Sequence, residues 1–487
     1  MDVLQGKVHI IINNGAPYSK VKPPRKIVIL GAGLAGLSAA YILSKAGRKV
    51  IVFESDSTVG GLSKTVNCRG FSFDLGGHRF ITRNKKIEQF VMELLNGDFL
   101  VVPRKSKIYM LNRYFDYPLR PANAVLGLGL STTLQIISDY CKERVKNTLR
   151  PPEIVSLEDW VINQFGRKMF DIYFKEYSEK VWGIECRRIS KEWVAQRIKG
   201  LSLWAAIKNG FFKFSGKEID TLSDKFVYPP MGIGQISEKL KERIEERENP
   251  VLTSTMAMQI NHEDFCIKTV VAKNCERSYD VKGSEFVSSI PLTNLVQLLN
   301  PAAPEDVVEA SSQLKYRDLI IVTIMLNRER VTDLTWMYLP EEEIPLGRIH
   351  EPKNWSPTMA PEGKTHIVAE YFCFKGDKIW NSSDEELTST TVGHLEKLGF
   401  TNKDEVIDSY VLRVPKAYPL FEIGYREHYS KILRYLQNFK NLHIIGRSGM
   451  FRYYNMDHAM ESGIEVAEHI LRMPLLEGER NSLLIGA

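Results

Sequence analysis

The sequence predicts an α/β protein in which a Rossmann-like dinucleotide-binding domain carries an inserted substrate domain of mixed helices and strands. Three observations predict this fold class. Three spaced glycines lie between a short apolar run and a helix-forming stretch near residue 30. The chain of 487 residues exceeds the size that a single core supports. Strand signals return near residues 226 and 441, after a long stretch of different character.

The glycines directly follow the apolar run 27–30. Gly31 permits a sharp turn, and Gly33 lets the backbone approach a pyrophosphate. Gly36 lets the following helix, expected over 34–46, pack closely against the strand. A diphosphate is therefore expected at the positive N-terminal end of that helix.

An acidic residue and a second glycine pair indicate which dinucleotide binds. Glu54 follows the apolar run 50–53, where a carboxylate can accept hydrogen bonds from both ribose hydroxyls. Gly60-Gly61-Leu62 resembles the GG motif that follows the acid in glutathione-reductase-like flavoproteins, and NAD-only domains do not usually carry it. The sequence thus predicts non-covalent FAD. These motifs predict cofactor contacts at Gly31, Gly33, Leu34, Ala35, Gly36, Glu54, Ser55, Gly61 and Leu62.

Composition excludes several other classes of protein. The net charge of +6 is modest for this length and no Lys/Arg block occurs, so no nucleic-acid partner is expected. This mildly basic balance suits an anionic substrate. The six cysteines are scattered without CxxC or metal-ligand spacing, which predicts free thiols, a reducing compartment and no metal site. We expect a cytoplasmic protein without a signal peptide.

One segment bears on membrane contact. Residues 121–138 carry no charge and include Ala-Val-Leu-Gly-Leu-Gly-Leu. Their Gly, Ser, Thr, Asn and Gln content favours a buried helix, so membrane contact is the less favoured alternative.

The order of patterns along the chain predicts a discontinuous cofactor domain. The pattern is largely helical from Thr82 to about Phe214, with a capping box at Ser156 to Asp159, and a β-meander follows over 251–290. A short strand runs into Gly446, and a helix over 458–472 follows it. The predicted division is an N-terminal extension (1–25), a FAD-binding domain (26–95, 225–305 and 400–472), a substrate domain (96–224 and 306–399) and a C-terminal tail (473–487).

Six motifs occur in order between residues 25 and 472. They are Gly76-Gly77-His78, Tyr117-Pro118, Lys180-Val-Trp182 with Trp193 and Arg197, Trp336-Met-Tyr338 with Arg348, Ala417-Tyr418-Pro419, and Gly446-Arg447 with Arg452-Tyr453 and Asp457-His458. In order and rough spacing they resemble the flavoprotein superfamily of amine oxidases and protoporphyrinogen oxidase. Within it they are most similar to the UDP-galactopyranose mutases of eukaryotic type.

This resemblance implies roles for the matched residues. His78 would lie beside the flavin, Arg197 would reach the sugar and flavin, and Arg348 would grip the diphosphate; these are the expected catalytic residues. The expected substrate contacts are Tyr117, Trp182, Trp336, Tyr338, Arg348, Tyr418, Arg447, Tyr453 and Asn455. The resemblance also implies further cofactor contacts at Gly77, His78, Ala257, Gly446, Arg447 and Asp457.

The chain departs from the mutase pattern at three places. Ser178 stands where the mutases tend to have Asn, Arg120 replaces an amide beside the uracil site, and the segment from Tyr453 to Asp457 is two residues shorter. The identity of the sugar and of the base therefore stays open.

The resemblance implies a pyranose–furanose mutase that acts on a nucleotide-linked sugar through reduced FAD. Flavin N5 would attack the anomeric carbon as the nucleoside diphosphate leaves. The alternative is an oxidoreductase of the amine oxidase, protoporphyrinogen oxidase or desaturase type, which transfers hydride from substrate to FAD. Gly232-Ile-Gly234 reads as a turn before a helix at Ile236, and not as a second dinucleotide-binding motif. Because the sequence thus indicates no separate nicotinamide domain, the reductant of the flavin would be NAD(P)H bound transiently or a redox protein.

Overall fold

A parallel sheet of five strands forms the centre of the dinucleotide-binding domain. The computed structural model describes residues 26–117, 123, 127–197 and 225–473. The strand order is β20 (Leu442–Ile444), β13 (Glu285–Ser288), β1 (Lys26–Leu30), β2 (Lys49–Phe53) and β9 (Val251–Leu252). The strands come from three distant parts of the chain. The predicted α/β class with a Rossmann-like domain is confirmed.

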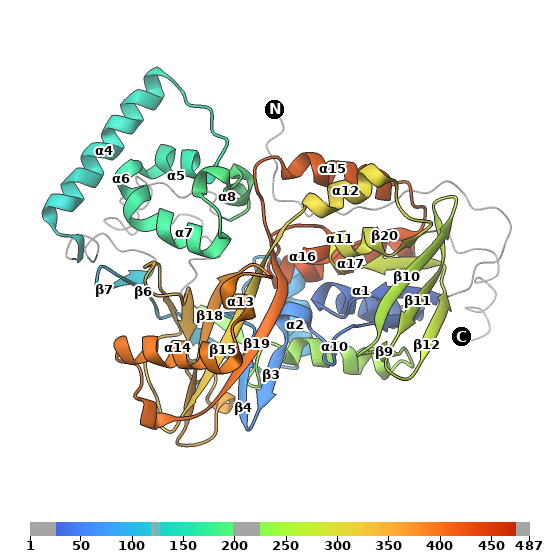
Figure 1. Cartoon of the computed structure of the whole chain (residues 1–487). Helices are drawn as coiled ribbons and strands as arrows, with labels where there is room; N and C mark the ends of the chain where they lie inside the picture. Colours follow the sequence, from blue (N-terminus) through green and yellow to red (C-terminus); the bar gives the residue numbers. More distant parts are fainter. Residues whose placement is uncertain (1–25, 118–122, 124–126, 198–224, 474–487) are drawn as a thin grey trace.

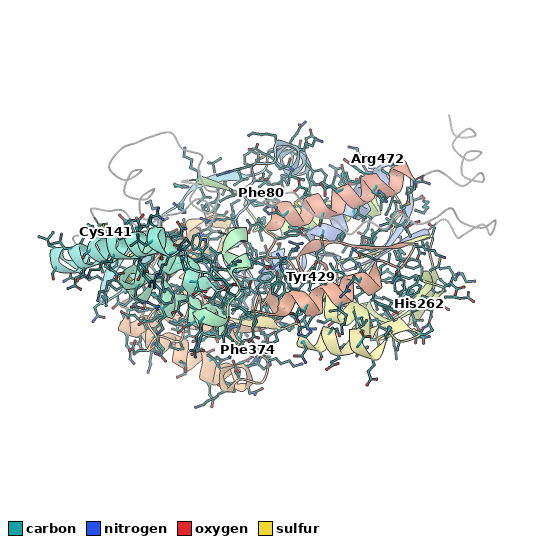
Figure 2. All side chains as sticks on the ribbon, turned by 90° about the horizontal axis from the view of Figure 1, so that it is seen from above. Phe80, Cys141, His262, Phe374, Tyr429 and Arg472 are labelled. Carbon is teal, nitrogen blue, oxygen red and sulfur yellow. The ribbon has the colours of Figure 1, made fainter. Side chains whose placement is uncertain are left out.

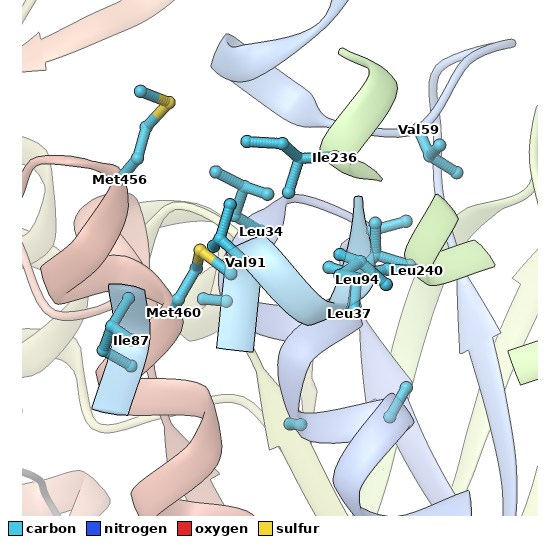
Figure 3. Packing of buried hydrophobic residues seen from close by; sticks show 14 of the residues in the cluster. Leu34, Leu37, Val59, Ile87, Val91, Leu94, Ile236, Leu240, Met456 and Met460 are labelled. Carbon is cyan, nitrogen blue, oxygen red and sulfur yellow. The ribbon is translucent and has the colours of Figure 1, made fainter. Parts of the chain in front are cut away.

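After their first residues, Lys26 and Lys49, strands β1 and β2 are apolar and buried, as expected for a parallel sheet that is covered on both faces. Ile27 and Ile29 face a helical layer, whereas Val28 and Leu30 face the opposite layer. Figure 3 shows the helical layer, where Leu37, Leu94 and Leu240 meet from three helices. The helical layer consists of α1 (Leu34–Lys45), α2 (Lys85–Leu94), α10 (Gln235–Glu245) and α17 (Met456–Arg472). The opposite layer consists of β10 (Met256–Glu263), β11 (Cys266–Lys273), β12 (Ser278–Lys282), α11 (Leu292–Gln297), α12 (Glu305–Gln313) and α15 (Tyr425–Leu436).

A second sheet of seven strands carries much of the inserted domain (Figure 1). Its order is β19 (Val406–Pro419), β15 (Tyr316–Leu326), β18 (Thr365–Cys373), β17 (Arg348–His350), β16 (Trp336–Tyr338), β6 (Ser106–Met110) and β7 (Arg113–Tyr117). Strands β15 and β18 are buried along their whole length. Helix α14 (Asp384–Lys397) packs on one face, and the hairpin of β3 (Thr65–Cys68) and β4 (Phe71–Asp74) packs on the other.

A group of helices completes the inserted domain. It contains α4 (Leu130–Leu149), α5 (Leu157–Phe165), α6 (Arg167–Met169), a π-helical turn (Phe170–Phe174), α7 (Lys175–Trp182) and α8 (Lys191–Arg197). The predicted capping box opens α5, since Ser156 Oγ accepts from the Asp159 amide at 3.1 Å and Asp159 accepts in return from the Ser156 amide at 2.9 Å.

The prediction of a buried helix over 121–138 is wrong for the part that the structure describes. Helix α4 forms the outer edge of the helical group (Figure 1), and Ile136 is its one buried residue. The other apolar residues of this segment that belong to α4, Leu130, Leu134 and Ile137, are exposed. In the described parts of the chain, no helix combines the length and apolar character that crossing a membrane needs.

The predicted helical pattern after Thr82 also fails over residues 100–117. This stretch forms β5 (Leu100–Pro103) and the hairpin of β6 and β7. Leu111 and Asn112 form its two-residue loop with φ of 53° and 54°, as a type I′ turn requires. The alternation of buried Ile108 and Met110 with half-buried neighbours was the available sequence signal.

Two predicted domain boundaries differ from the structure. Strand β19 pairs with β15 over most of its length, so the residues up to 419 belong to the seven-stranded sheet rather than to the cofactor domain. Helix α12 packs through Val307 and Ala310 against the cofactor domain, which therefore extends beyond residue 305. The predicted extension 1–25 and the tail after residue 473 lie outside the described residues.

The close crossing of α17 over α1 yields a stability prediction. A Cβ on Gly463 would lie 2.1 Å from the Ala35 carbonyl oxygen, so Gly463→Ala must force the two helices apart. We expect the free energy of unfolding to fall by about 1 to 3 kcal/mol, measured by urea titration. Gly393→Ala in α14 is the matched control, because no atom lies within 4 Å of its added Cβ. That variant should be neutral or gain up to about 1 kcal/mol; equal loss in both variants would contradict the packing argument.

Candidate functional site

The glycine turn after β1 has the geometry of a phosphate-binding turn. Gly31 has φ of +96°, and a Cβ on Gly36 would lie 2.0 Å from the Gly31 carbonyl oxygen, so the helix can approach the strand only without that side chain. Around Gly33, by contrast, no atom lies within 4 Å of an added Cβ. The backbone is therefore open on this side, at the N-terminal end of α1.

Glu54 lies beside this turn at the end of β2. Its Oε2 accepts from the Ala32 amide at 2.7 Å, and its Oε1 accepts from the Asp56 amide at 2.9 Å. The side chain is 8% exposed and lines the same cavity as Gly31 and Gly33. These two bonds fix the carboxylate at the height of the turn, where a ribose next to the diphosphate would lie.

One cavity of about 760 Å³ runs from the glycine turn to the seven-stranded sheet. It thus joins the cofactor domain to the inserted domain. It brings together most residues that the sequence predicts for cofactor and substrate. The predicted residues that line it are Gly31, Gly33, Leu34, Ala35, Glu54, Ser55, Gly61, Leu62, Gly77, His78, Ala257, Trp336, Tyr338, Arg348, Tyr418, Arg447, Tyr453 and Asn455.

The other predicted residues lie around this cavity. Gly36 and Gly446 shape its backbone, and Asp457 accepts from the His458 amide at 2.9 Å in the first turn of α17. The Tyr117 ring lies 4.8 Å from the Tyr338 ring, and the buried Trp182 ring lies edge-on to Tyr418 and Tyr453 at 6.2 and 6.0 Å. Arg197 ends α8, and its side chain lies outside the described residues.

The glycine-histidine loop after β4 packs tightly against the inserted domain. A Cβ on Gly77 would lie 1.5 Å from the Trp336 ring, so only glycine fits there. Burial and, to a smaller extent, the positive charges of Arg447 and Arg348 together lower the pKa of His78 to about 4. The imidazole is therefore neutral at physiological pH.

A buried ion pair holds one arginine in the cavity wall. Arg348 and Glu370 are register partners on β17 and β18, and the Arg348 guanidinium donates to the Glu370 carboxylate. Burial opposes the charged guanidinium, but Glu370 together with the nearby Tyr418, Tyr177 and Tyr453 outweighs burial and raises the pKa of Arg348 above its ordinary range. Arg348 Nη2 also donates to Tyr418 Oη at 2.8 Å, which orients that hydroxyl.

A second arginine comes from the cofactor domain. The Tyr418 and Tyr453 rings stack at 5.9 Å with an interplanar angle of 21°. The Arg447 guanidinium lies 4.8 Å from the first ring centroid and 4.4 Å from the second. Arg447 Nη1 donates to the Tyr454 carbonyl at 3.2 Å, whereas its Nε and Nη2 have no partner among the described residues.

Two residues that contact side chains of the site were missed in the sequence. Glu370 is fully buried, and it is the one acidic residue in the apolar strand Thr365–Cys373, which was the available signal. Tyr177 lies in α7 with its ring 5.4 Å from the Tyr338 ring. Burial raises the pKa of Tyr177 well above its ordinary value. No pattern in the sequence distinguished this tyrosine from its neighbours.

A comparison with known families identifies the fold and its cofactor. The sequence model of the family described as flavin containing amine oxidoreductase matches residues 34–471. The chain belongs to this family. FAD is its cofactor, which confirms the prediction made from the glycine and acid motifs.

Individual relatives align over a smaller part of the chain. An L-amino acid oxidase of Cerastes cerastes is 26% identical over 174 residues, which make up 32% of this chain and 33% of that protein. An L-amino-acid oxidase of Crotalus adamanteus is 40% identical over 158 residues, which make up 29% of this chain and 31% of that protein. The chain thus spans about a third of the length of the curated relatives that it matches.

Solved structures match almost the whole chain. A reduced UDP-galactopyranose mutase superimposes with a TM-score of 0.80 and 23% identity, covering 94% of this chain and 95% of that chain. A putrescine oxidase bound to putrescine superimposes with a TM-score of 0.63 and 16% identity, covering 92% of this chain and 99% of that chain. Cyclohexylamine oxidase from Brevibacterium oxydans superimposes with a TM-score of 0.62 and 14% identity, covering 92% of this chain and 100% of that chain. At these identities the likeness shows the fold.

The cavity fits FAD on its own chemistry. The open backbone at Gly33 and the carboxylate of Glu54 suit a diphosphate next to a ribose. Farther along, the buried atoms His78 Nδ1, Trp336 Nε1 and Arg447 Nε have no hydrogen-bond partner among the described residues. Buried polar atoms normally have partners, so these atoms mark where bound groups belong.

Glu54 provides a test of the cofactor site. Glu54→Gln removes the charge that strengthens the hydrogen bonds at the turn, so we expect FAD affinity to fall about tenfold. The measurement is a titration of apoprotein with FAD, followed by flavin fluorescence. Glu248→Gln is the control, since Glu248 is exposed and pairs with Lys49 at 3.3 Å away from the cavity. Unchanged affinity in Glu54→Gln would contradict the assigned contact.

The histidine of the glycine loop provides a pH test. Unfolded histidine takes up its proton near pH 6.5, whereas His78 in the folded protein does so near 4. Its contribution to the free energy of unfolding is therefore full above 6.5 and lost as pH falls toward 4. Histidine-selective NMR, with the resonance assigned through His78→Gln, should show that the His78 imidazole stays neutral as the pH is lowered through 6.5. A midpoint near 6.5 would disprove the shift.

Proposed function

We propose that this chain interconverts the pyranose and furanose forms of a nucleotide-linked sugar through reduced FAD. The observation that supports this function best is the pair of guanidinium groups, Arg348 and Arg447, beside two tyrosines in the cavity. Guanidinium groups bind phosphate oxygens bidentately, and tyrosine hydroxyls add donors without further charge. This set matches the diphosphate of a nucleotide sugar.

The charge of the same set disfavours a cationic substrate. A stacked tyrosine pair can bind an ammonium group through its ring faces. Here the Arg447 guanidinium already lies within 5 Å of both ring centroids, at 4.8 and 4.4 Å, and Arg348 bonds to Tyr418. An amine would meet a like charge at this position, whereas a diphosphate would meet complementary charge.

The residues of the chain divide the work of this reaction. Bound reduced FAD supplies the nucleophile for the anomeric carbon. Arg348, charged because of Glu370, and Arg447 stabilise the diphosphate as negative charge develops on it. Tyr418 and Tyr453 orient the same group. His78, neutral and buried, holds the face of the cavity next to the flavin without adding charge.

The alternative function is oxidation by hydride transfer to FAD. The stacked tyrosine pair favours it, and so does the likeness to L-amino acid oxidases, because a substrate carboxylate could bind Arg447. An amino acid, however, also brings an ammonium group, which would meet the like charge of Arg447 at the tyrosine pair. We infer that the mutase would receive electrons from NAD(P)H or from a redox protein.

The redox state of the flavin separates the two functions. The purified protein is incubated anaerobically with UDP-galactopyranose and other nucleotide sugars, with its FAD oxidised or reduced by dithionite, and products are separated by chromatography. We expect isomerisation only with reduced FAD. If no sugar nucleotide reacts and L-amino acids or amines bleach oxidised FAD instead, the mutase proposal is wrong.

Removal of either guanidinium group tests the diphosphate site. Arg348→Ala and Arg447→Ala should each lower turnover by about a hundredfold or more, because each removes a charge-assisted contact to the leaving group. FAD content, measured by absorbance, checks that the cavity is intact. Arg187→Ala is the control, since Arg187 is exposed and pairs with Glu185 at 2.9 Å. Turnover that persists in both site variants would contradict the proposed role.

A further inference from the structure

Helix α4 presents an apolar stripe that points away from the protein. Its members recur at spacings of three and four residues, as one face of a helix requires. The exposed fractions are 66% for Leu130, 58% for Leu134, 43% for Ile137 and 62% for Val145, and Cys141 is also exposed. No described residue covers this stripe, which continues to Leu149 at 77% exposure.

The opposite face of α4 attaches the helix to the protein. Ile136 is buried there, Asp139 accepts from the Lys168 amide at 2.8 Å, and Asn147 donates to Asn163 at 2.8 Å. Helix α4 therefore already packs on the protein through its other face, and the stripe is not needed for that packing. Helix α4 lies on the outer edge of the helical group (Figure 1), and Figure 2 places Cys141, a member of the stripe, at the end of the molecule far from His262 and Arg472.

The charges of α4 are sorted between the two faces. Successive residues of an α-helix are turned by about 100° around its axis, which places Arg144 along one side of the stripe and Lys142 along the other. Both side chains are exposed. The acids lie on the attached face, where Asp139 bonds to Lys168 and Glu143 pairs with Lys146 at 3.6 Å. An apolar stripe with cationic borders requires a partner that is apolar inside and anionic at its surface.

We propose that α4 docks this stripe on an anionic lipid surface, with the helix parallel to the membrane plane. Its twenty residues and its two distinct faces match an interfacial helix, whose aliphatic side chains enter the headgroup region while cations meet lipid phosphates. A second copy of the chain fits less well, because it would bring the same cationic borders. A protein partner would be expected to meet aromatic anchors, and this stripe consists of Leu, Ile, Val and Cys.

The exposed cysteines allow a direct test on the holoenzyme. A polarity-sensitive fluorophore is attached to Cys141 in Cys275→Ser, and to Cys275 in Cys141→Ser as the control. Cys275 is also exposed, but it lies in the turn between β11 and β12 of the other domain. Vesicles of phosphatidylcholine with phosphatidylserine should shift the Cys141 emission to shorter wavelength and leave the Cys275 emission unchanged. Pure phosphatidylcholine vesicles should have little effect.

Variants separate the apolar and electrostatic contributions in vesicle sedimentation. The double variant Leu134→Glu/Ile137→Glu should abolish binding, and Lys142→Glu/Arg144→Glu should lower the partition coefficient about tenfold or more. Ile407→Glu is the matched control, because Ile407 is 47% exposed on β19, remote from α4. FAD content and melting temperature are compared to confirm that each variant is folded.

Several results would overturn the proposal. One is sedimentation that does not depend on anionic lipid or on the stripe. Another is a Cys141 that reacts slowly without vesicles, which would show that another segment of the chain covers the stripe. A third is a dimer in light scattering that Leu134→Glu/Ile137→Glu dissociates, which would assign the stripe to a second copy.

Discussion

The buried ion pair between Arg348 and Glu370 constrains the rest of the active site. A guanidinium group can be held in a dry cavity wall only beside an opposite charge, because desolvation of an unpaired ion is too costly. Register pairing of β17 with β18 places the two side chains together. The loop above them must then come close without side chains of its own: a Cβ on Gly76 would lie 3.2 Å from Glu370, and one on Gly77 would enter the Trp336 ring.

The cofactor domain imposes a second constraint, which is the close packing of α1 against β1 and α17. Gly36 lets α1 approach β1, and Gly463 lets α17 approach α1. Helix α17 in turn follows the segment that carries Arg447 and Tyr453. The last strand and helix of the chain therefore bring these side chains to a cavity whose glycine turn lies more than four hundred residues earlier in the sequence.

The sequence predicts the parts of this protein in which local pattern and tertiary role coincide. The glycine turn, Glu54 and the strand before Gly446 have steric or electrostatic requirements that few other residues meet. Other parts depend on distant contacts that no local pattern reveals. The stretch 106–117 is a hairpin because β16 provides a strand to pair with β6, and α4 is exposed because its polar residues bond to neighbours in α5 and α6. Glu370 acquires its role only once β17 lies beside it.

The two guanidinium groups belong to different parts of the molecule. Arg348 is fixed in the seven-stranded sheet, and Arg447 follows the last strand of the cofactor sheet. If these two groups bind the diphosphate as proposed, one half of the substrate site belongs to the cofactor domain and the other half to the insertion. Inheritance of the flavin site alone would then pass on only half of the substrate preference. Divergence within the insertion would change the substrate that is bound while the flavin site stays as it is.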